Sequence, residues 1–326
     1  MSNLRDARVL VTGATGFIGS HLARRLIAEG AQVSAFRRVG SAGFSLRGAN
    51  VERTDSTGAP RRVRTPSIDW HDVDLRTYGA MSNAVKAIRP EVVFHLAAAG
   101  VTDPFLSPDA AIRANVYGTI HLLRAVDGKA PVIVARTPGE PDAMNVYAAS
   151  KAAAWTFCQM YHRTHGWPIV GVMPFQTYGP GQSAKSLIPS AIAAALRGDD
   201  FPMTHGEQQR DWVYIDDVAA AFVRVGSRCL QMPLTIDGET IEVGTGRIAS
   251  VREAVELIYR AAGGTGRPLV GVLPARPGEV ERQAADADRT EQFIGWRARV
   301  SLEDGLRETI AWVREWPTKL ANKLAN

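Results

Sequence analysis

Cysteine and long hydrophobic runs are scarce in this 326-residue sequence. Neither of its two cysteines, Cys158 and Cys229, lies in a CxxC or Cys/His pattern, so we expect buried thiols rather than a disulfide or a zinc site. No apolar run approaches the roughly 18 residues of a membrane-spanning helix. The first residues, MSNLRDARVLVTG, run into a strand pattern without a signal peptide. The sequence therefore predicts a cytoplasmic protein that does not bind a membrane.

Basic residues outnumber acidic ones, but they are scattered along the chain. The net charge is +5 and the isoelectric point is near 9.4. Nucleic-acid binding would require basic residues on one face with interleaved aromatic residues, which the pattern lacks. His71, His95 and His205 stand in unrelated segments without ligand spacing, so no metal site is expected. The one looser basic group comprises Arg47, Arg53, Arg61, Arg62 and Arg64.

Short apolar runs alternate with helical patterns through the first half of the chain. The runs are ARVLVTG, QVSAF, EVVFHLA, PVIVA and IVGVMPF. Apolar residues recur at helical spacing in 17–31 and at about 77–88, 109–127 and 146–165. Buried strands separated by helices predict an α/β fold with a doubly wound parallel sheet.

The pattern changes after residue 175. Amphipathic helices at 186–198, 214–226, 250–264 and 301–316 follow with only short strands between them, which predicts a smaller α/β region at the edge of the sheet. We divide the chain into 1–175, 176–316 with some chain crossing back to the first part, and a tail at 317–326. Residues 40–67 are polar and basic without periodicity, so they are predicted to form a long surface loop.

A glycine-rich turn stands between the first strand and the first helix. The stretch TGATGFIG places Gly13, Gly16 and Gly19 at three-residue spacing. A dinucleotide pyrophosphate approaches the backbone closely at such a turn and rests on free N–H groups at the helix N-terminus. The strand, turn and helix context favours a dinucleotide site in 1–175 over a plain glycine-rich turn.

The second strand ends without the carboxylate that a NAD site normally offers to the adenosine ribose. Its end reads QVSAFRRVG, and no acidic residue occurs from Gly30 through Val51. Arg37 and Arg38 suit a 2′-phosphate, which guanidinium groups bind through charge-assisted hydrogen bonds. The sequence favours NADP over NAD, and a solvated basic rim is the alternative interpretation of the two arginines.

Further motifs follow in a specific order. TGATGFIG, VVFHLAA, NVYGT, YAASK, YGPGQ, QQRDWVYIDDVAAA and RPGE occur in sequence within residues 7 to 313. In this order the chain closely resembles the extended short-chain dehydrogenase/reductase family, whose members act on nucleotide-linked sugars. The resemblance implies a Rossmann-type dinucleotide-binding domain at 1–175 and a region at 176–316 that mainly binds the nucleotide sugar.

The resemblance also implies site residues at matching positions. Asp74 matches the position that meets the adenine, and Leu96, Ala97 and Ala98 match the nicotinamide side. Residues expected to contact the dinucleotide are Gly13, Thr15, Gly16, Phe17, Ile18, Gly19, Arg37, Arg38, Asp74, Leu75, Leu96, Ala97, Ala98, Lys151 and Pro174. Residues expected to contact the nucleotide sugar are Gln176, Arg210 and Arg276.

Thr137, Tyr147 and Lys151 are the predicted catalytic residues. Tyr147 and Lys151 are four positions apart in a helical segment, so they share one face. A tyrosine with a pKa near 10 is a poor base at neutral pH, and an adjacent cation and an oxidised nicotinamide are expected to lower that pKa. In the family the lysine also hydrogen-bonds the nicotinamide ribose, and a Ser or Thr after the fifth strand holds the reacting oxygen. Thr137 matches that position.

The chain departs from the family pattern around these residues. Sugar 4,6-dehydratases place Asp-Glu directly after the threonine to eliminate water, whereas Pro-Gly follows Thr137 and Glu140 is displaced by one position. Dehydration is therefore disfavoured. Tyr147 follows Thr137 by only ten positions, which is expected to remove part of a substrate-pocket wall. Gln176 stands where many relatives carry Asn, and Asp211 and Asp217 are expected to fix the backbone rather than touch substrate.

Two enzymatic activities stay open from the sequence. The leading one is an NADP(H)-dependent oxidoreductase that reduces a nucleotide-linked 4-keto-6-deoxysugar, with Tyr147 as proton donor; the alternative is an epimerase that retains NAD. A catalytically silent regulator would be expected to lack Tyr147 or Lys151, and both are present. Relatives are often dimers built from two helices of each subunit, so a homodimer through 109–127 and 146–165 is expected.

Overall fold

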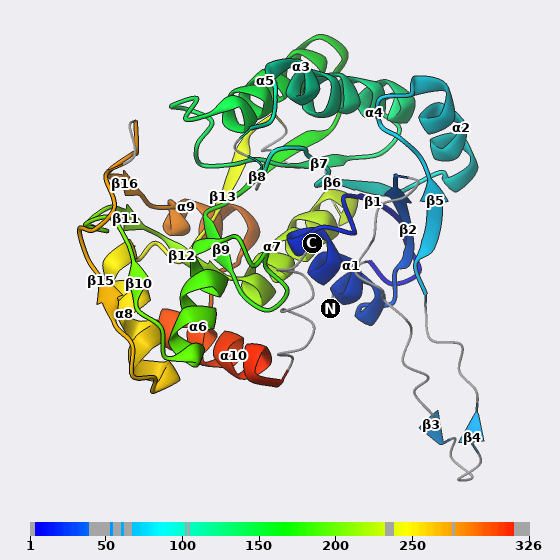
Figure 1. The fold of residues 1–326 in the computed structure, drawn as a ribbon. Helices are drawn as coiled ribbons and strands as arrows, with labels where there is room; N and C mark the ends of the chain where they lie inside the picture. The colour runs from blue at the N-terminus through cyan, green and yellow to red at the C-terminus, as the bar shows by residue number, and fades with distance from the viewer. Residues whose placement is uncertain are drawn as a thin grey trace.

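A parallel sheet is the centre of the molecule (Figure 1). The computed structural model describes residues 4–38, 53–54, 60–61, 67–101, 103, 105–231, 238–275 and 278–315. The sheet strands are β1 (Arg8–Thr12), β2 (Gln32–Arg37), β5 (Asp69–Asp72), β6 (Val92–His95), β7 (Val132–Ala135), β8 (Ile169–Pro174) and β13 (Thr240–Val243). Their order is β13-β8-β7-β6-β1-β2-β5, and every neighbouring pair is parallel. The predicted doubly wound parallel sheet is confirmed.

Helices cover both faces of this sheet. The helices α1 (Phe17–Ala28) and α7 (Ile215–Gln231) lie on one face, and α2 (Tyr78–Ile88), α4 (Gly118–Val126) and α5 (Val146–His165) lie on the other (Figure 1). Side chains of successive strand residues point to opposite faces. In β1, Val9 and Val11 pack with Leu22 and Leu26 of α1, whereas Leu10 belongs to the core on the other face. Burial on both faces explains why the strands read as continuous apolar runs.

The segment predicted as one helix at 109–127 has three parts. It begins with α3 (Pro108–Ala111), continues as a π-helix, η1 (Ile112–Tyr117), and ends as α4. Ser107 caps α3 by accepting a hydrogen bond from the Ala110 N–H at 3.3 Å. Single π-helical turns widen a helix locally and are frequent at functional sites. The widened turn lies against α5.

A smaller region lies at one edge of the sheet. Its helices are α6 (Leu187–Arg197), α8 (Val251–Ala262) and α10 (Leu302–Glu315), whereas α9 (Ala287–Ile294) packs against β13 of the main sheet and against α7. A separate apolar core, which includes Ile192, Ile258 and Ile310, joins α6, α8 and α10. Short strands connect these helices: β9 (Gln176–Tyr178), β10 (Phe201–Pro202), β11 (Gln209–Arg210), β12 (Trp212–Tyr214), β14 (Ala249–Ser250), β15 (Pro268–Leu269) and β16 (Arg282–Gln283).

Other sequence-based expectations meet the structure only in part. Within the predicted loop 40–67, β3 (Arg53–Thr54) and β4 (Pro60–Arg61) form a short antiparallel pair. The other residues of 40–66 and the whole tail 317–326 lie outside the described residues. Neither cysteine forms a disulfide; Cys158 lies in α5 and Cys229 in α7. No helix in the described ranges is long and apolar enough to cross a membrane.

Candidate active site

The residues predicted to bind and react gather at one edge of the sheet. Because all seven strands are parallel, their carboxyl ends meet there, and ligands of doubly wound sheets bind outside those ends. Gly13 directly follows β1, Arg37 ends β2, Leu96 follows β6, Pro174 ends β8, and Thr137 stands two residues beyond β7. Strand order alone therefore brings together segments that are far apart in the sequence.

The glycine turn packs closely against the loop after β6 and against its own backbone. Gly13 has a positive φ of 77°, and a Cβ atom there would lie 2.6 Å from the Ala97 nitrogen; a Cβ at Gly19 would lie 2.1 Å from the Gly13 oxygen. The N-cap of α1 is Gly16, with no side-chain cap and no acidic residue in the first turn. The first N–H groups of α1 therefore stay open to an anion, and these residues fit a dinucleotide pyrophosphate. Half-buried neighbours in the same turn are Thr15, Phe17 and Ile18.

Acidic residues from β5 and its following turn stand beside the arginines of β2. Arg37 and Asp72 are neighbours in register, and Arg37 Nε donates to Asp72 Oδ1 at 2.8 Å. Asp74 accepts hydrogen bonds from Arg76, which hold the pKa of Asp74 below its ordinary value, and the Arg38 charge acts in the same direction. The sequence lacks a carboxylate near Arg37, but strand pairing supplies one. The adjoining Leu75 packs against α4 at Gly118.

A buried histidine supports the loop that follows β6. His95 is 1% exposed, with Nδ1 2.7 Å from the Thr12 hydroxyl and Nε2 2.8 Å from the Thr119 hydroxyl. Thr119 donates its proton to the Asn115 carbonyl, so it accepts from Nε2–H, and Thr12 then donates to Nδ1. Burial lowers the pKa of His95 to about 3, so the ring is neutral. Thr12 also accepts from the Ala97 N–H, which fixes the loop at the nicotinamide side.

Asn115 in the π-helix joins this loop to the catalytic helix. Its Oδ1 accepts from the Ala99 N–H at 2.7 Å, and its Nδ2 donates to the Ala99 carbonyl and to the Ser150 hydroxyl. Ser150 in turn donates to the Tyr147 carbonyl at 2.8 Å. Sequence reasoning did not select Asn115, because the π-helical turn that aims it at both partners is invisible in the apolar periodicity. The half-buried Ala98 lies within the loop so held.

Tyr147 and Lys151 lie on the first turns of α5, as their spacing predicts. The side chain of Asn145 caps this helix by accepting from the Ala148 N–H at 2.9 Å. Burial, and then the Glu140 carboxylate, raise the pKa of Tyr147 to about 12. In the structure without a dinucleotide, burial thus moves this pKa in the direction opposite to the one expected with the cation and an oxidised nicotinamide in place. Tyr147 is protonated at neutral pH.

Lys151 is 3% exposed, and burial lowers its pKa. Among the residues that the structure describes, its Nζ has no hydrogen-bond or ion-pair partner. The ammonium therefore keeps its donors for a ligand. This fits the role implied by the resemblance, in which it bonds the ribose of a dinucleotide.

The turn after β7 holds Thr137 through Glu140. Glu140 Oε1 accepts from the Thr137 N–H at 2.8 Å, and Oε2 accepts from Arg136 Nε at 2.7 Å and pairs with its Nη2 at 2.6 Å. The Glu140 side chain is 1% exposed. Both carboxylate oxygens are therefore engaged by the protein, which argues further against a dehydratase-type acid or base at this position.

Two of the predicted substrate residues, Gln176 and Arg210, lie on short strands of two small sheets. Arg210 of β11 is buried, pairs with Glu279 at 3.5 Å and is the register partner of Gln283 in β16. Gln283 Nε2 donates to the carbonyl of Pro138 at 3.2 Å, so this strand pair touches the turn that carries Thr137. The half-buried Gln176 pairs in register with Trp212. Gln283 was not selected from the sequence, and Arg276 lies outside the described residues.

The two aspartates expected to fix the backbone do so. Asp211 is fully buried, and its oxygens accept from the N–H and hydroxyl of Thr245 and from the N–H groups of Gly246 and Ala285. Asp217 accepts from the N–H groups of residues 299 and 300 at 2.9 Å. Within the described ranges, no three His, Cys, Asp or Glu side chains are grouped as a metal site requires.

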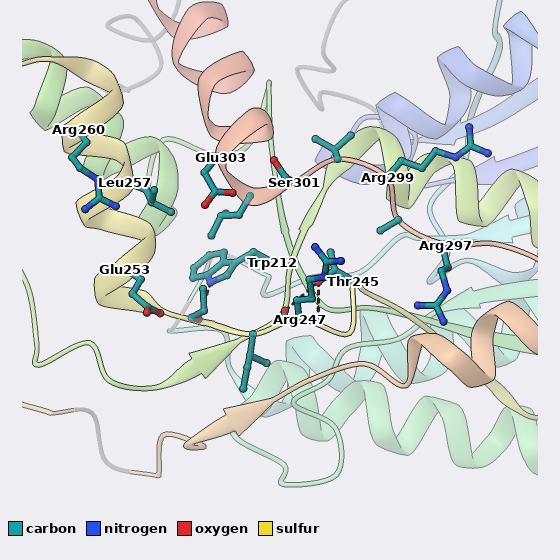
Figure 2. A pocket seen from close by; sticks show the side chains of 15 residues that line it. Trp212, Thr245, Arg247, Glu253, Leu257, Arg260, Arg297, Arg299, Ser301 and Glu303 are labelled. Carbon is teal, nitrogen blue, oxygen red and sulfur yellow. Dashed lines mark hydrogen bonds between the residues drawn. The ribbon is translucent and has the colours of Figure 1, made fainter.

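A separate cavity of about 630 Å³ lies between α8, the start of α10 and residues 297–301 (Figure 2). Trp212 forms one wall, and none of the predicted catalytic residues lines it. Its charged lining is mixed in sign, and one of its arginines, Arg297, already pairs with Asp288 and Glu291. The lining therefore favours neither an anionic nor a cationic ligand. The charged residues that line it are Arg247, Arg260, Arg297, Arg299, Glu253 and Glu303.

Comparison with known proteins agrees with this arrangement. The model of the NAD dependent epimerase/dehydratase family matches residues 9–244. A UDP-glucose 4-epimerase of Mycolicibacterium smegmatis is 30% identical, over 94% of this chain and 98% of that protein. A dTDP-glucose 4,6-dehydratase of Neisseria gonorrhoeae is 28% identical, over 96% and 97% of the two chains. The crystal structure of a Thermotoga maritima UDP-glucose 4-epimerase with UDP-glucose superposes with a TM-score of 0.78 at 25% identity, covering 94% and 98%.

The family match spans most of the chain, and the relatives are enzymes that act on nucleotide sugars. The chain belongs to the NAD-dependent epimerase/dehydratase family, within the extended short-chain dehydrogenases/reductases.

Proposed function

We propose that the protein is an NADP(H)-dependent reductase of a nucleotide-linked 4-keto-6-deoxysugar. The observation that carries the proposal is the half-buried Tyr147, which is protonated at neutral pH and lies one helical turn from the buried Lys151 on α5. A protonated phenol is suited to give a proton to an oxygen that becomes negatively charged. The chemistry that a bound nicotinamide supplies is hydride transfer.

Each residue has a separate task in this proposal. Thr137 orients the keto oxygen through its hydroxyl, and Tyr147 donates the proton from Oη to that oxygen. Lys151 stabilises the phenolate that remains and bonds the ribose. Arg210 and Gln176, with Arg276 as proposed from the sequence, bind the nucleotide sugar, so residues 176–316 mainly supply the substrate site and residues 1–175 the dinucleotide site.

The preference for NADP rests on the end of β2. Arg37 and Arg38 stand where many NAD sites have a carboxylate. The bond from Arg37 to Asp72 uses Nε and is exposed on both sides. Exposed ion pairs contribute little to stability, and a guanidinium has five donors, so Arg37 can bind a 2′-phosphate beside Asp72 or in its place.

The second candidate is an epimerase that retains NAD. It is favoured by the Asp72 carboxylate, which is close enough to the end of β2 to bond Arg37 and could accept from a ribose hydroxyl instead. It is also supported by a Thermus thermophilus UDP-glucose 4-epimerase, 27% identical with a TM-score of 0.76, whose structure contains NAD.

Cofactor titration separates the two candidates. Dinucleotide-free protein titrated with NADPH and with NADH at fixed ionic strength should bind NADPH more tightly, by roughly 30- to 150-fold. Arg37→Asp should reverse this preference, whereas Asp72→Asn, which removes the negative charge beside Arg37, should preserve or increase it. A protein that purifies with tightly held NAD, or that prefers NADH, contradicts the reductase and favours the epimerase.

We also propose that the protein is a homodimer through α5 and the α3–η1–α4 segment. Exposed apolar side chains on these elements support it: Ile112 and Tyr117 are 43% and 52% exposed, and Phe157 is 40% exposed. Sedimentation of the protein and of Tyr117→Glu tests the interface. A monomer in both cases would contradict it.

A further inference from the structure

An ion pair between Arg136 and Glu140 holds the turn between β7 and α5, and the proposed reaction gives it no role. Arg136 begins the turn and is fixed from three sides. Its guanidinium stacks 4.6 Å from the Trp155 ring of α5 and bonds the Thr240 hydroxyl of β13. A Cβ at Gly171 of β8 would lie 2.9 Å from Arg136 Cδ. These contacts hold the Arg136 side chain in a fixed position, where it pairs with Glu140.

Glu140 bonds to Arg136 and to the backbone of the turn. Its carboxylate bonds both Arg136 and the Thr137 N–H, and its own N–H donates to the Thr137 carbonyl at 3.1 Å. Both polar backbone groups of Thr137 are thus bound by one residue. Gly139, between them, is buried, and a Cβ there would lie 3.5 Å from the Ala148 Cβ of α5. The turn is thereby seated against the residue that follows Tyr147.

We propose that Glu140, held by Arg136, is a positioning residue of the active site: it holds the Thr137 backbone in the turn that packs against α5 beside Tyr147. The inference deepens the proposed function and rests on it. Glu140 is displaced by one position from the acidic pair of the dehydratases. In this proposal it acts on Thr137 and Tyr147 and does not act on the substrate.

Among the charged groups near Tyr147, Glu140 is the one that raises the pKa of the phenol in addition to burial. Lys151 shares α5 with Tyr147, and His95 of β6 is neutral. Asp103, in the loop after β6, is exposed and accepts from the Phe105 N–H. Burial raises the pKa of Tyr147 first and Glu140 raises it next. Since a negative charge favours the protonated phenol, neutralising Glu140 must lower that pKa.

The test follows the phenol directly and requires no substrate. A fluorinated tyrosine of lower intrinsic pKa is placed at position 147 of the full chain, and its fluorine resonance is titrated with pH. Glu140→Gln should move the midpoint about one unit lower. Glu91→Gln is the matched control, because Glu91 also accepts from a backbone N–H and an arginine, both of Arg8, at the opposite edge of the sheet. Its midpoint should stay unchanged.

A second variant provides the same test if Glu140→Gln does not fold. Arg136→Gln with Glu140→Gln removes both charges and leaves two amides that can bond each other. Because loss of the Arg136 charge acts in the opposite direction, a smaller downward shift of the midpoint is expected. An unchanged midpoint in a folded variant overturns the proposal. With a keto-sugar substrate, Glu140→Gln should also lower kcat by about tenfold or more with KM nearly constant. Absence of sugar turnover in the parent protein would refute the proposed function alone, because the fluorine titration does not depend on it.

Discussion

Replacing Lys151 by Met is expected to stabilise the dinucleotide-free protein while weakening dinucleotide binding. Lys151 is 3% exposed, and its ammonium is without a partner in the described part of the chain. The charge of a buried lysine costs several kcal/mol of folding free energy. The Glu140 charge offsets part of this cost. Met keeps most of the volume and fills irregular space well. We expect the free energy of unfolding in urea to rise by about 1–3 kcal/mol.

The same variant should lose a charge-assisted hydrogen bond to the dinucleotide. Calorimetry should show affinity reduced roughly 10- to 150-fold. Lys129→Met is the control, since the Lys129 side chain is 79% exposed and neither quantity should change. A lower free energy of unfolding in Lys151→Met would refute the reasoning, because it would mean that the ammonium stabilises the empty site.

The pH dependence of this difference has a definite sign. Burial lowers the pKa of Lys151 from the ordinary 10.5, so the unfolded chain holds the proton more tightly than the folded one. The penalty is complete below the folded-state pKa and disappears as pH rises towards the unfolded value. The stability advantage of Lys151→Met should therefore shrink as pH rises through that window.

Three further predictions test other parts of the site. Tyr147→Phe should lower turnover by on the order of 100-fold or more with dinucleotide affinity nearly constant; wild-type turnover would remove Tyr147 from the mechanism. Arg210→Ala should weaken nucleoside diphosphate binding by roughly 1.5–3 kcal/mol in calorimetry and leave the dinucleotide unaffected, and equal diphosphate affinity would place the substrate elsewhere. Asp211→Asn should lower the free energy of unfolding by about 2–4 kcal/mol in urea, because the amide must point N–H groups at two donors in either orientation; an unchanged midpoint would contradict this.

The sheet and the gathering of the site at its edge could be predicted from local patterns. Continuous apolar runs identify strands buried on two faces, and parallel pairing then fixes which loop ends meet. This is why Gly13, Leu96 and Thr137 could be assigned to one edge before their positions were known. The cap of α5 by Asn145 and the Tyr147–Lys151 spacing are also local features.

The remaining features depend on contacts between distant segments. Asp72 reaches Arg37 only through the β2–β5 register, and Gln283 reaches the Thr137 turn across 145 positions. The direction of the Tyr147 pKa follows from burial, which composition does not reveal. The ion pair of Arg136 and Glu140 spans four positions, but in a turn, where helical spacing rules do not apply.

The return of the chain to the main sheet limits how this protein can diversify. β13 is hydrogen-bonded to β8, and Phe222 of α7 packs against Phe94 of β6, so the second half of the chain completes the first. Exchange of residues 176–316 between relatives would therefore replace a sheet strand and a covering helix together with the sugar site. New substrate specificity is more accessible through single changes in short strands such as β16, which touch the catalytic turn without supporting the sheet.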